Sequence, residues 1–304
     1  MTDAGPGPGG APGRGRGPLS SLRMSLRSLS ASAWMGIQHD LAWTSMPVAL
    51  VLRVVSPFAA SMTVAIIYWF GVGGTSSATF SGSQLAYVLV GATLYSQVAA
   101  YAWVPTVAIA EGKNLAVFPH IYLTARSTAL YVAGRTVSAF VIATTVSIAA
   151  LAAAYYVLGS FLHATIPLNV TPVTALMVGA ALVADFPAAL GLGYYLGAYS
   201  LYASKFEWSL PGYIAGLLMV FSGALFPPSV LRYAVLSTAA TYLPFTQYIN
   251  AARIAIVPGI TGSYLWSMGV CILGGAVFMG TGLLVYFAAE RKARKDGVID
   301  RRMA

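Results

Sequence analysis

Charged residues are scarce in this sequence. Asp, Glu, Lys and Arg make up 8% of its 304 residues, whereas a soluble domain has about 25%. Hydrophobic residues make up 58% of the chain. So few charges leave too little polar surface for a water-exposed protein of this size. Composition therefore excludes an ordinary soluble protein and predicts an integral membrane protein.

Cysteine and histidine are equally sparse. The single cysteine, Cys271, lies inside an apolar run, which excludes a disulfide within the chain. The three histidines, His39, His120 and His163, are far apart in the sequence. Zinc sites need clustered ligands, so each histidine is interpreted as a structural or surface residue, and no metal site is predicted.

Nucleotide-binding and catalytic motifs are also absent. Gly112-Lys113 lacks both the upstream glycine and the following Ser or Thr of a Walker A motif. No GxSxG or HExxH motif occurs either. The chain is therefore expected to bind no cofactor, to hold no ATP phosphates and to be no enzyme.

Long apolar runs are abundant instead. A helix rises ~1.5 Å per residue and must cross ~30 Å of hydrocarbon, so about 20 apolar residues form one membrane span. Five runs meet this requirement, and a sixth, residues 210–226, is shorter and ends at the Pro227-Pro228 pair. Together they predict an all-α integral membrane protein with six transmembrane helices. The runs cover residues 47–70, 85–110, 130–158, 172–196, 210–226 and 264–289, within a membrane domain of residues 19–289.

The flanking segments have different compositions. Residues 1–18 are rich in Gly and Pro, and we expect them to be disordered. Residues 19–44 place leucines on one helical face and arginines on the adjoining face, which predicts an amphipathic helix in the membrane interface. Residues 290–304 form a basic tail.

Basic residues are distributed asymmetrically. They gather before the first run, in residues 111–135 and in the tail, but residues 71–84 and 159–171 contain no Lys or Arg. Cytoplasmic loops retain Lys and Arg, so we expect both termini in the cytoplasm. The net charge of +9 then reflects topology and anionic membrane lipids, and nucleic acid is not expected as a partner.

The connection at residues 227–262 is too apolar for a solvated loop, and four prolines interrupt it. Irregular backbone at membrane depth is tolerated only where protein buries it or where it lines a cavity. We therefore expect two short helices after the fifth span, forming a re-entrant hairpin in the outer leaflet.

Two features suggest function. Residues 111–135 hold three cations between two apolar runs, so this segment is either a simple cytoplasmic connection or a surface helix on which another protein pushes. Asp185 is the only carboxylate deep in a predicted span. It either contacts a substrate or proton path, or is a structural residue at a helix interface.

The order of these features resembles the membrane permeases of type-2 ABC transporters, which are mostly exporters. An interfacial helix precedes the first span, and Glu111, Thr124-Ala125 and Gly134-Arg135 border the second and third spans. SGALFPPSV at 222–230 and YLPFTQYINAAR at 242–253 resemble the outer hairpin of that family. The usual Gly-Thr-Leu-Glu is missing, and the proline lies earlier, at Pro119.

The resemblance implies a half-transporter in a prokaryotic plasma membrane. Two permease subunits, identical or different, would each bind a separate ATPase subunit that holds ATP and Mg. The substrate would be a drug, lipid, polysaccharide or peptide. The residues implied in coupling to the ATPase are Glu111, Lys113, Pro119, Thr124, Arg126 and Arg135. Those implied in the outer gate hairpin are Phe226, Pro227, Pro228, Pro244 and Arg253. Independently of the resemblance, Asp185 is predicted on a possible substrate path, because it is a carboxylate deep in a span.

Two alternatives belong to other functional classes. An ion- or proton-coupled secondary transporter would use Asp185, but no internal repeat between halves is visible. A membrane enzyme would need a cluster of catalytic side chains, which the sequence does not offer.

Overall fold

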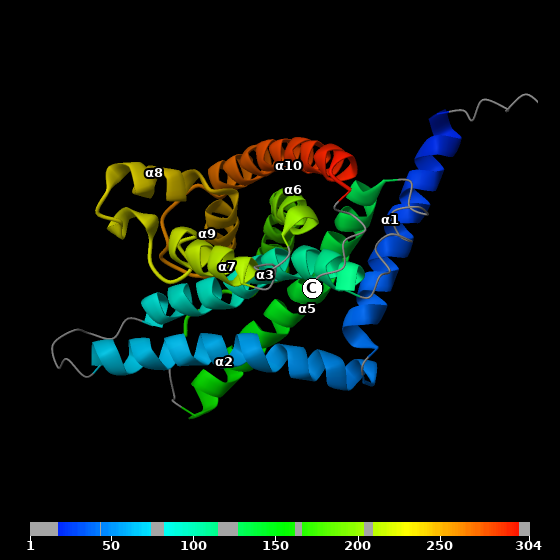
Figure 1. Cartoon of the computed structure of the whole chain (residues 1–304). Coiled ribbons are helices and arrows are strands. Elements are labelled where there is room, and N and C mark those ends of the chain that lie inside the picture. The colour runs from blue at the N-terminus through cyan, green and yellow to red at the C-terminus, as the bar shows by residue number, and fades with distance from the viewer. Residues whose placement is uncertain are drawn as a thin grey trace, which may run out of the picture.

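The computed structural model describes residues 18–42, 44–73, 82–114, 127–161, 166–203 and 209–297. Within these ranges the regular secondary structure consists of nine α-helices and one 3-10 helix, without a strand (Figure 1). The segment 1–18 expected to be disordered lies outside the described residues except for Pro18, as do residues 298–304 of the basic tail.

Five of the six predicted runs are confirmed as helices long and apolar enough to cross a membrane, which indicates a multi-pass membrane protein. Each extends a few residues beyond its predicted limits at one end or both. They are α2 (Met46–Gly73), α3 (Gly82–Asn114), α5 (Thr128–Phe161), α6 (Pro172–Tyr202) and α10 (Tyr264–Lys295).

The remaining run, 210–226, differs from its prediction. It forms α7 (Leu210–Phe221), a helix of 12 residues, which spans only about 18 Å at 1.5 Å per residue. The helix is followed by a turn in which Gly223 adopts φ +66°, the left-handed conformation that commonly ends helices. The all-helical, multi-pass architecture is thus established, whereas the count of six spans stays a prediction.

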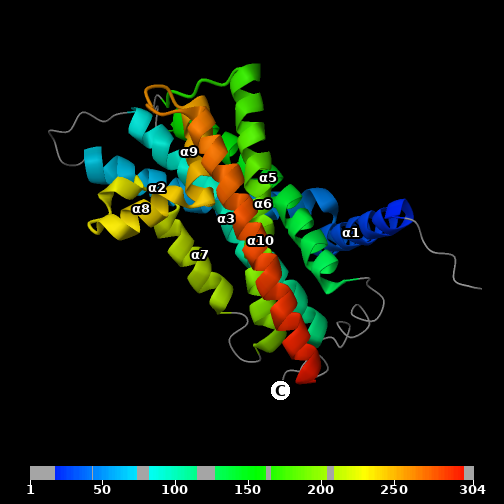
Figure 2. The same ribbon diagram turned by 90° about the horizontal axis from the view of Figure 1, so that it is seen from above.

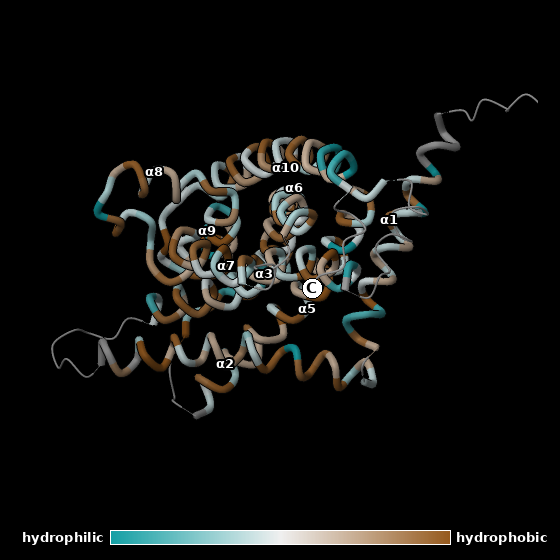
Figure 3. The backbone as a smooth tube through the Cα atoms, viewed as in Figure 1, coloured by the Kyte–Doolittle hydropathy of each residue, from teal (hydrophilic) through white to brown (hydrophobic). Residues whose placement is uncertain are grey.

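The long helices form two groups. Helices α6 and α10 lie side by side, while α3 and α5 pack next to each other and α2 runs along their outer side (Figures 1 and 2). The tubes of these helices are mainly apolar, and polar residues gather at the C-terminal end of α10 (Figure 3). Much of α2 is exposed, with Val51 64% accessible and Phe70 70% accessible.

Helices α6 and α10 touch through small residues. A Cβ atom added to Gly282 would lie 2.7 Å from the carbonyl oxygen of Gly191, and one added to Gly191 would lie 2.7 Å from the backbone of Phe278. Such close approach of two backbones is typical of membrane helices, where packing replaces the hydrophobic effect as the driving force.

The predicted interfacial helix is present as α1 (Pro18–Leu41), and it packs against α5. Ala33 and Gly36 are buried there, whereas Leu26 of the predicted apolar face is 57% exposed. A Cβ on Gly36 would lie 2.3 Å from Ser138 Oγ. Position in a membrane interface stays a prediction.

Gly134→Ala is expected to loosen α1 from α5. The new Cβ would lie 2.4 Å from Ser32 Cβ and 2.9 Å from the backbone nitrogen of Ala33. Overpacking of this kind costs about 1–3 kcal/mol. Gly159→Ala in the same helix meets no atom within 4 Å and serves as the control. Thermal unfolding in detergent should show a lower Tm for Gly134→Ala only, and equal Tm values would contradict the packing.

The connection at residues 227–262 contains the two expected short helices, α8 (Ala234–Tyr242) and α9 (Pro244–Ile256), preceded by the 3-10 turn η1 (Pro228–Val230). Leu243 caps the C-terminal end of α8 and immediately precedes α9, whose first residue is Pro244. Most of α9 is buried, while α8 buries only Ala240. The depth of this hairpin in a membrane stays a prediction.

Candidate functional site

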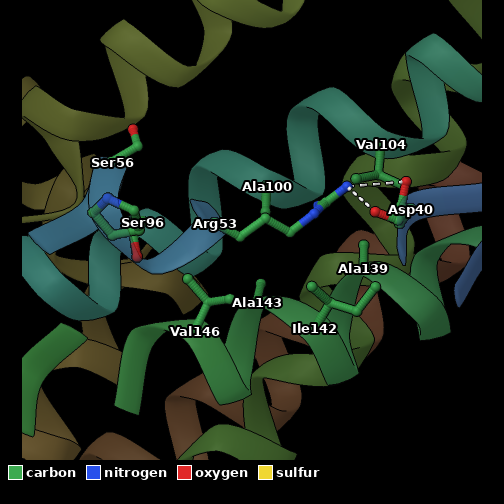
Figure 4. Close-up of a pocket in the computed structure, with 11 residues that line it drawn as sticks. Asp40, Arg53, Ser56, Ser96, Ala100, Val104, Ala139, Ile142, Ala143 and Val146 are labelled. Carbon is green, nitrogen blue, oxygen red and sulfur yellow. Dashed lines mark hydrogen bonds and ion pairs between the residues drawn. The ribbon is translucent and has the colours of Figure 1, made fainter. Parts of the chain in front are cut away.

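Four charged or titratable side chains connect three helices near the end of α1. His39 Nε2 lies 3.2 Å from Glu111 Oε2 of α3, and His39 Nδ1 lies 3.5 Å from Asp40 Oδ1. Arg53 of α2 places Nη2 3.4 Å from Asp40 Oδ1 and donates a 3.1 Å hydrogen bond to the Asp40 carbonyl (Figure 4). We call His39, Asp40, Arg53 and Glu111 the polar junction.

The polar junction gives Glu111, the first residue of the predicted coupling segment, a specific neighbour. His39 and Asp40 lie in the last turn of α1, and Glu111 lies in the last turn of α3. The contact therefore forms where the C-terminal ends of these two helices meet. Asp40 is 8% exposed. A partly buried carboxylate with a guanidinium beside it forms a stronger contact than a pair in open solvent, where ion pairs contribute little.

The other predicted coupling residues fall into two sets. Pro119, Thr124 and Arg126 lie outside the described residues. Lys113 and Arg135 are both buried, at 5% and 3% exposure. Contact of these two cations with a partner stays a prediction, but the structure gives each of them neighbours within the chain.

Lys113 contacts the end of α6. Its Nζ donates to the carbonyl oxygens of Ser200 and Leu201, the latter at 2.8 Å, and α6 ends at Tyr202. The last carbonyls of a helix have no intrahelical donor and carry partial negative charge, so an ammonium group stabilises them. Lys113 therefore joins the C-terminal ends of α3 and α6.

Lys113→Met is expected to destabilise this end of the bundle. Methionine keeps most of the side-chain volume but leaves two carbonyls without their donor, and a charged hydrogen bond contributes about 1.5–3 kcal/mol. Lys295→Met, at an exposed position in the last turn of α10, is the control. Limited proteolysis should cut after α6 faster in Lys113→Met than in wild type or control. An unchanged cleavage rate would contradict the capping role.

Arg135 faces α1. A Cβ atom on Gly36 would lie 3.1 Å from Arg135 Nη1, so the absence of a side chain at Gly36 makes room for the guanidinium. Arg135 Nε has no hydrogen-bond partner within the described ranges. The contact between α1 and α5 thus encloses a cation close to the segment that joins α3 to α5.

The hairpin is held by Arg253 of α9, which is 2% exposed. Its Nε donates to the Tyr87 carbonyl of α3 at 3.0 Å, its Nη1 to the Gly223 carbonyl at 2.7 Å, and its Nη2 to the Ala224 carbonyl. The guanidinium carbon also lies 3.5 Å from the centre of the Tyr87 ring. We call Arg253, its partners Tyr87, Gly223 and Ala224, and the adjacent Gly91 the arginine hub.

Among the residues of the predicted gate hairpin, Arg253 makes the contacts that join α9 to α3 and to the turn after α7. Pro244 is buried at the start of α9, Phe226 and Pro228 are half-buried, and Pro227 is exposed. Gly91 was missed by sequence reasoning. A Cβ there would lie 1.8 Å from Arg253 Nη2 and 2.0 Å from the Ala224 carbonyl oxygen, so only glycine fits beside the guanidinium.

Asp185 of α6 is fully buried, and neither of its carboxylate oxygens has a hydrogen-bond partner in the part of the chain that the structure describes. Tyr101 of α3 and Tyr248 of α9 are also fully buried. Gln97 links these two tyrosines: it accepts from Tyr248 Oη at 3.0 Å and donates to Tyr101 Oη. Sequence reasoning found Asp185 but missed Gln97, although a glutamine amid an apolar run was a visible signal.

Metal ligands do not gather anywhere within the described ranges, where no group of three or more His, Cys, Asp or Glu side chains is placed to hold an ion. Comparison with known proteins finds no matching family model and no matching curated protein. What the sequence and structure establish together is an all-helical chain whose described part holds five helices able to cross a membrane, the architecture of a multi-pass membrane protein.

Proposed function

We propose that this chain is the permease subunit of an ATP-driven transporter and moves its substrate, a drug, lipid, polysaccharide or peptide, outward. In this proposal α7 completes six spans, both termini face the cytoplasm, and a second permease subunit completes the pathway. ATPase subunits on separate chains supply ATP hydrolysis. The sequence motifs and their order support it.

The observation that carries the proposal is the contact of α1 with both sides of the 111–135 segment. His39 connects α1 to Glu111 at the end of α3, 3.2 Å away. Gly36 and Gly134 bring α1 against the start of α5. A force applied to this segment by another protein would therefore reach α1 and, through Asp40 and Arg53, α2. A chain that lacks a nucleotide motif needs such a mechanical input from outside.

The arginine hub supports the other half of the proposal, the outer gate. Arg253 holds α9 to α3 and to the turn after α7 through three carbonyl groups. Because α7 is short and ends at this turn, displacement of α3 would be transmitted to the hairpin. In the proposed cycle this opens the path on the outer side.

The test is co-purification with the ATPase subunit encoded beside this chain. Glu111→Ala and Arg126→Glu are expected to weaken the complex or to change its ATPase rate severalfold. Arg232→Glu, an exposed charge before α8, should leave both unchanged. If no ATPase subunit co-purifies, and the two variants behave like wild type, the proposal is wrong.

A second candidate function, proton-coupled transport without an ATPase, is favoured by one observation, the buried carboxyl of Asp185, which lacks a hydrogen-bond partner within the described ranges. Liposomes that contain only this chain and an internal pH-sensitive dye should then show proton flux, and Asp185→Asn should abolish it. Absence of flux in wild type would reject this candidate.

A further inference from the structure

A cavity of about 190 Å³ lies between α2, α3 and α5, beside the polar junction (Figure 4). Arg53 extends along it toward Asp40, and the walls are mostly aliphatic. The walls include Ala100, Val104, Ile142 and Val146. The lining also includes the Asp40 carboxylate and the hydroxyl groups of Ser56 and Ser96, so the guanidinium and its partner carboxylate face a cavity with mainly apolar walls.

Not all hydrogen-bond donors of the Arg53 guanidinium are used by Asp40. Arginine carries five N–H donors, and the hydrogen bond and ion pair to Asp40 both use Nη2. Neither Nε nor Nη1 has a partner within the described ranges. The side chain is 34% exposed, so these donors are accessible from the cavity. These two donors lie on different edges of the guanidinium, because each two-point fork includes Nη2, so each can donate a separate charge-assisted hydrogen bond to a phosphate oxygen.

A second cavity of about 510 Å³ adjoins the first and shares Val146 with it. It is a groove between α2 and α5 whose only polar lining residue is Thr145. On α5 the lining residues Val146, Ala149, Ala153 and Val157 recur every three or four residues, so they form one stripe. The stripe is about 16 Å long at 1.5 Å per residue.

The geometry points to a binding site for a phospholipid of the surrounding bilayer, a role that does not depend on ATP-driven transport. The phosphate accepts a charge-assisted hydrogen bond from Nη1 of Arg53, and an acyl chain lies in the groove between α2 and α5. The cationic end and the apolar groove meet at Val146, as the head and tail of a lipid require. A bound phosphate shares Arg53 with Asp40 and so weakens the contact between α2 and α1.

The test measures binding of a fluorescent phosphatidylglycerol to the purified full-length chain in detergent. Arg53→Gln is expected to weaken binding about tenfold, because it removes a charge-assisted hydrogen bond. The affinity of Arg53→Lys should lie between those of wild type and Arg53→Gln, since lysine keeps the charge without the planar guanidinium. Arg232→Gln, an exposed arginine outside both cavities, should bind like wild type.

The groove is tested with a matched pair on α5. Ala153→Trp fills the groove and should weaken binding both of the phospholipid and of a fluorescent diacylglycerol with the same chains. Ala152→Trp, at an exposed neighbour outside the groove, should not. Glycerol phosphate, which has the anion without the tail, should compete poorly.

Three results would overturn the proposal. Arg53→Gln could bind phosphatidylglycerol like Arg232→Gln, or glycerol phosphate could compete as well as the lipid does. Alternatively, Ala153→Trp could change the oligomeric mass with lipid binding intact, which would make the groove a protein interface. Low reactivity of buried Cys271 confirms that each variant is folded. No ATPase subunit is present in these assays, so their failure leaves the transport proposal standing.

Discussion

Arg253→Met is expected to destabilise the folded chain strongly and to release the hairpin formed by α8 and α9. Methionine retains the apolar stem but leaves the carbonyls of Tyr87, Gly223 and Ala224 without the donors that Arg253 supplies. Each buried polar group left unsatisfied costs about 1–3 kcal/mol, so three such groups give a total of about 3–9 kcal/mol. The hairpin should detach from α3, and expression in the membrane should fall.

The matched control is Arg232→Met, because Arg232 is exposed. Gly91→Ala tests the same arginine hub from the opposite side, since its Cβ would displace the guanidinium. Protease sensitivity of the hairpin and Tm in detergent are the measurements. If Arg253→Met has the Tm of Arg232→Met, the hub does not hold the hairpin.

Gly282→Ala is expected to force α10 away from α6. The added Cβ would lie 2.7 Å from the Gly191 carbonyl oxygen and 3.2 Å from Gly191 Cα. Both atoms belong to the backbone, so no side-chain rotation relieves the clash, and a cost at the upper end of about 1–3 kcal/mol follows. The lone cysteine reports the change, because Cys271 is completely buried on the same helix. Its reaction with a thiol-specific dye should accelerate.

Gly280→Ala provides the control within the same helix, since its Cβ would meet no atom within 4 Å. Alanine is favoured over glycine in a helix by up to ~1 kcal/mol, so this variant should be neutral or slightly more stable. Equal dye reactivity in the two variants would show that α6 and α10 are not in backbone contact.

The spans could be predicted because one physical rule, apolar length, determines them. The same rule placed the fifth run at residues 210–226, whereas α7 ends at Phe221. Hydropathy continues through Ala224, Leu225 and Phe226 even though the chain turns at Gly223. The left-handed conformation of one glycine cannot be inferred from the hydropathy of its neighbours.

The charged residues show a different limit. The positive-inside rule concerns the side of the membrane on which a cation lies, and it says nothing about burial. Lys113 is buried against carbonyl groups at the end of α6, and one of them belongs to Ser200, 87 residues away in the sequence. A contact between residues so far apart cannot be predicted from the sequence around Lys113. The sequence identified Arg253 as the last residue of the resemblance to the outer hairpin. It could not identify Tyr87 and Gly91 as neighbours of Arg253, because no local sequence pattern connects them to α9.

The contact between Gly191 and Gly282 also decides which parts of the molecule can move independently. Two helices whose backbones touch have no layer of side chains between them, so we expect α6 and α10 to move as one rigid unit. In the proposed transport cycle, α1, α2, α3 and α5 would then move relative to this pair, and Lys113 would connect the two groups through its hydrogen bond to Leu201.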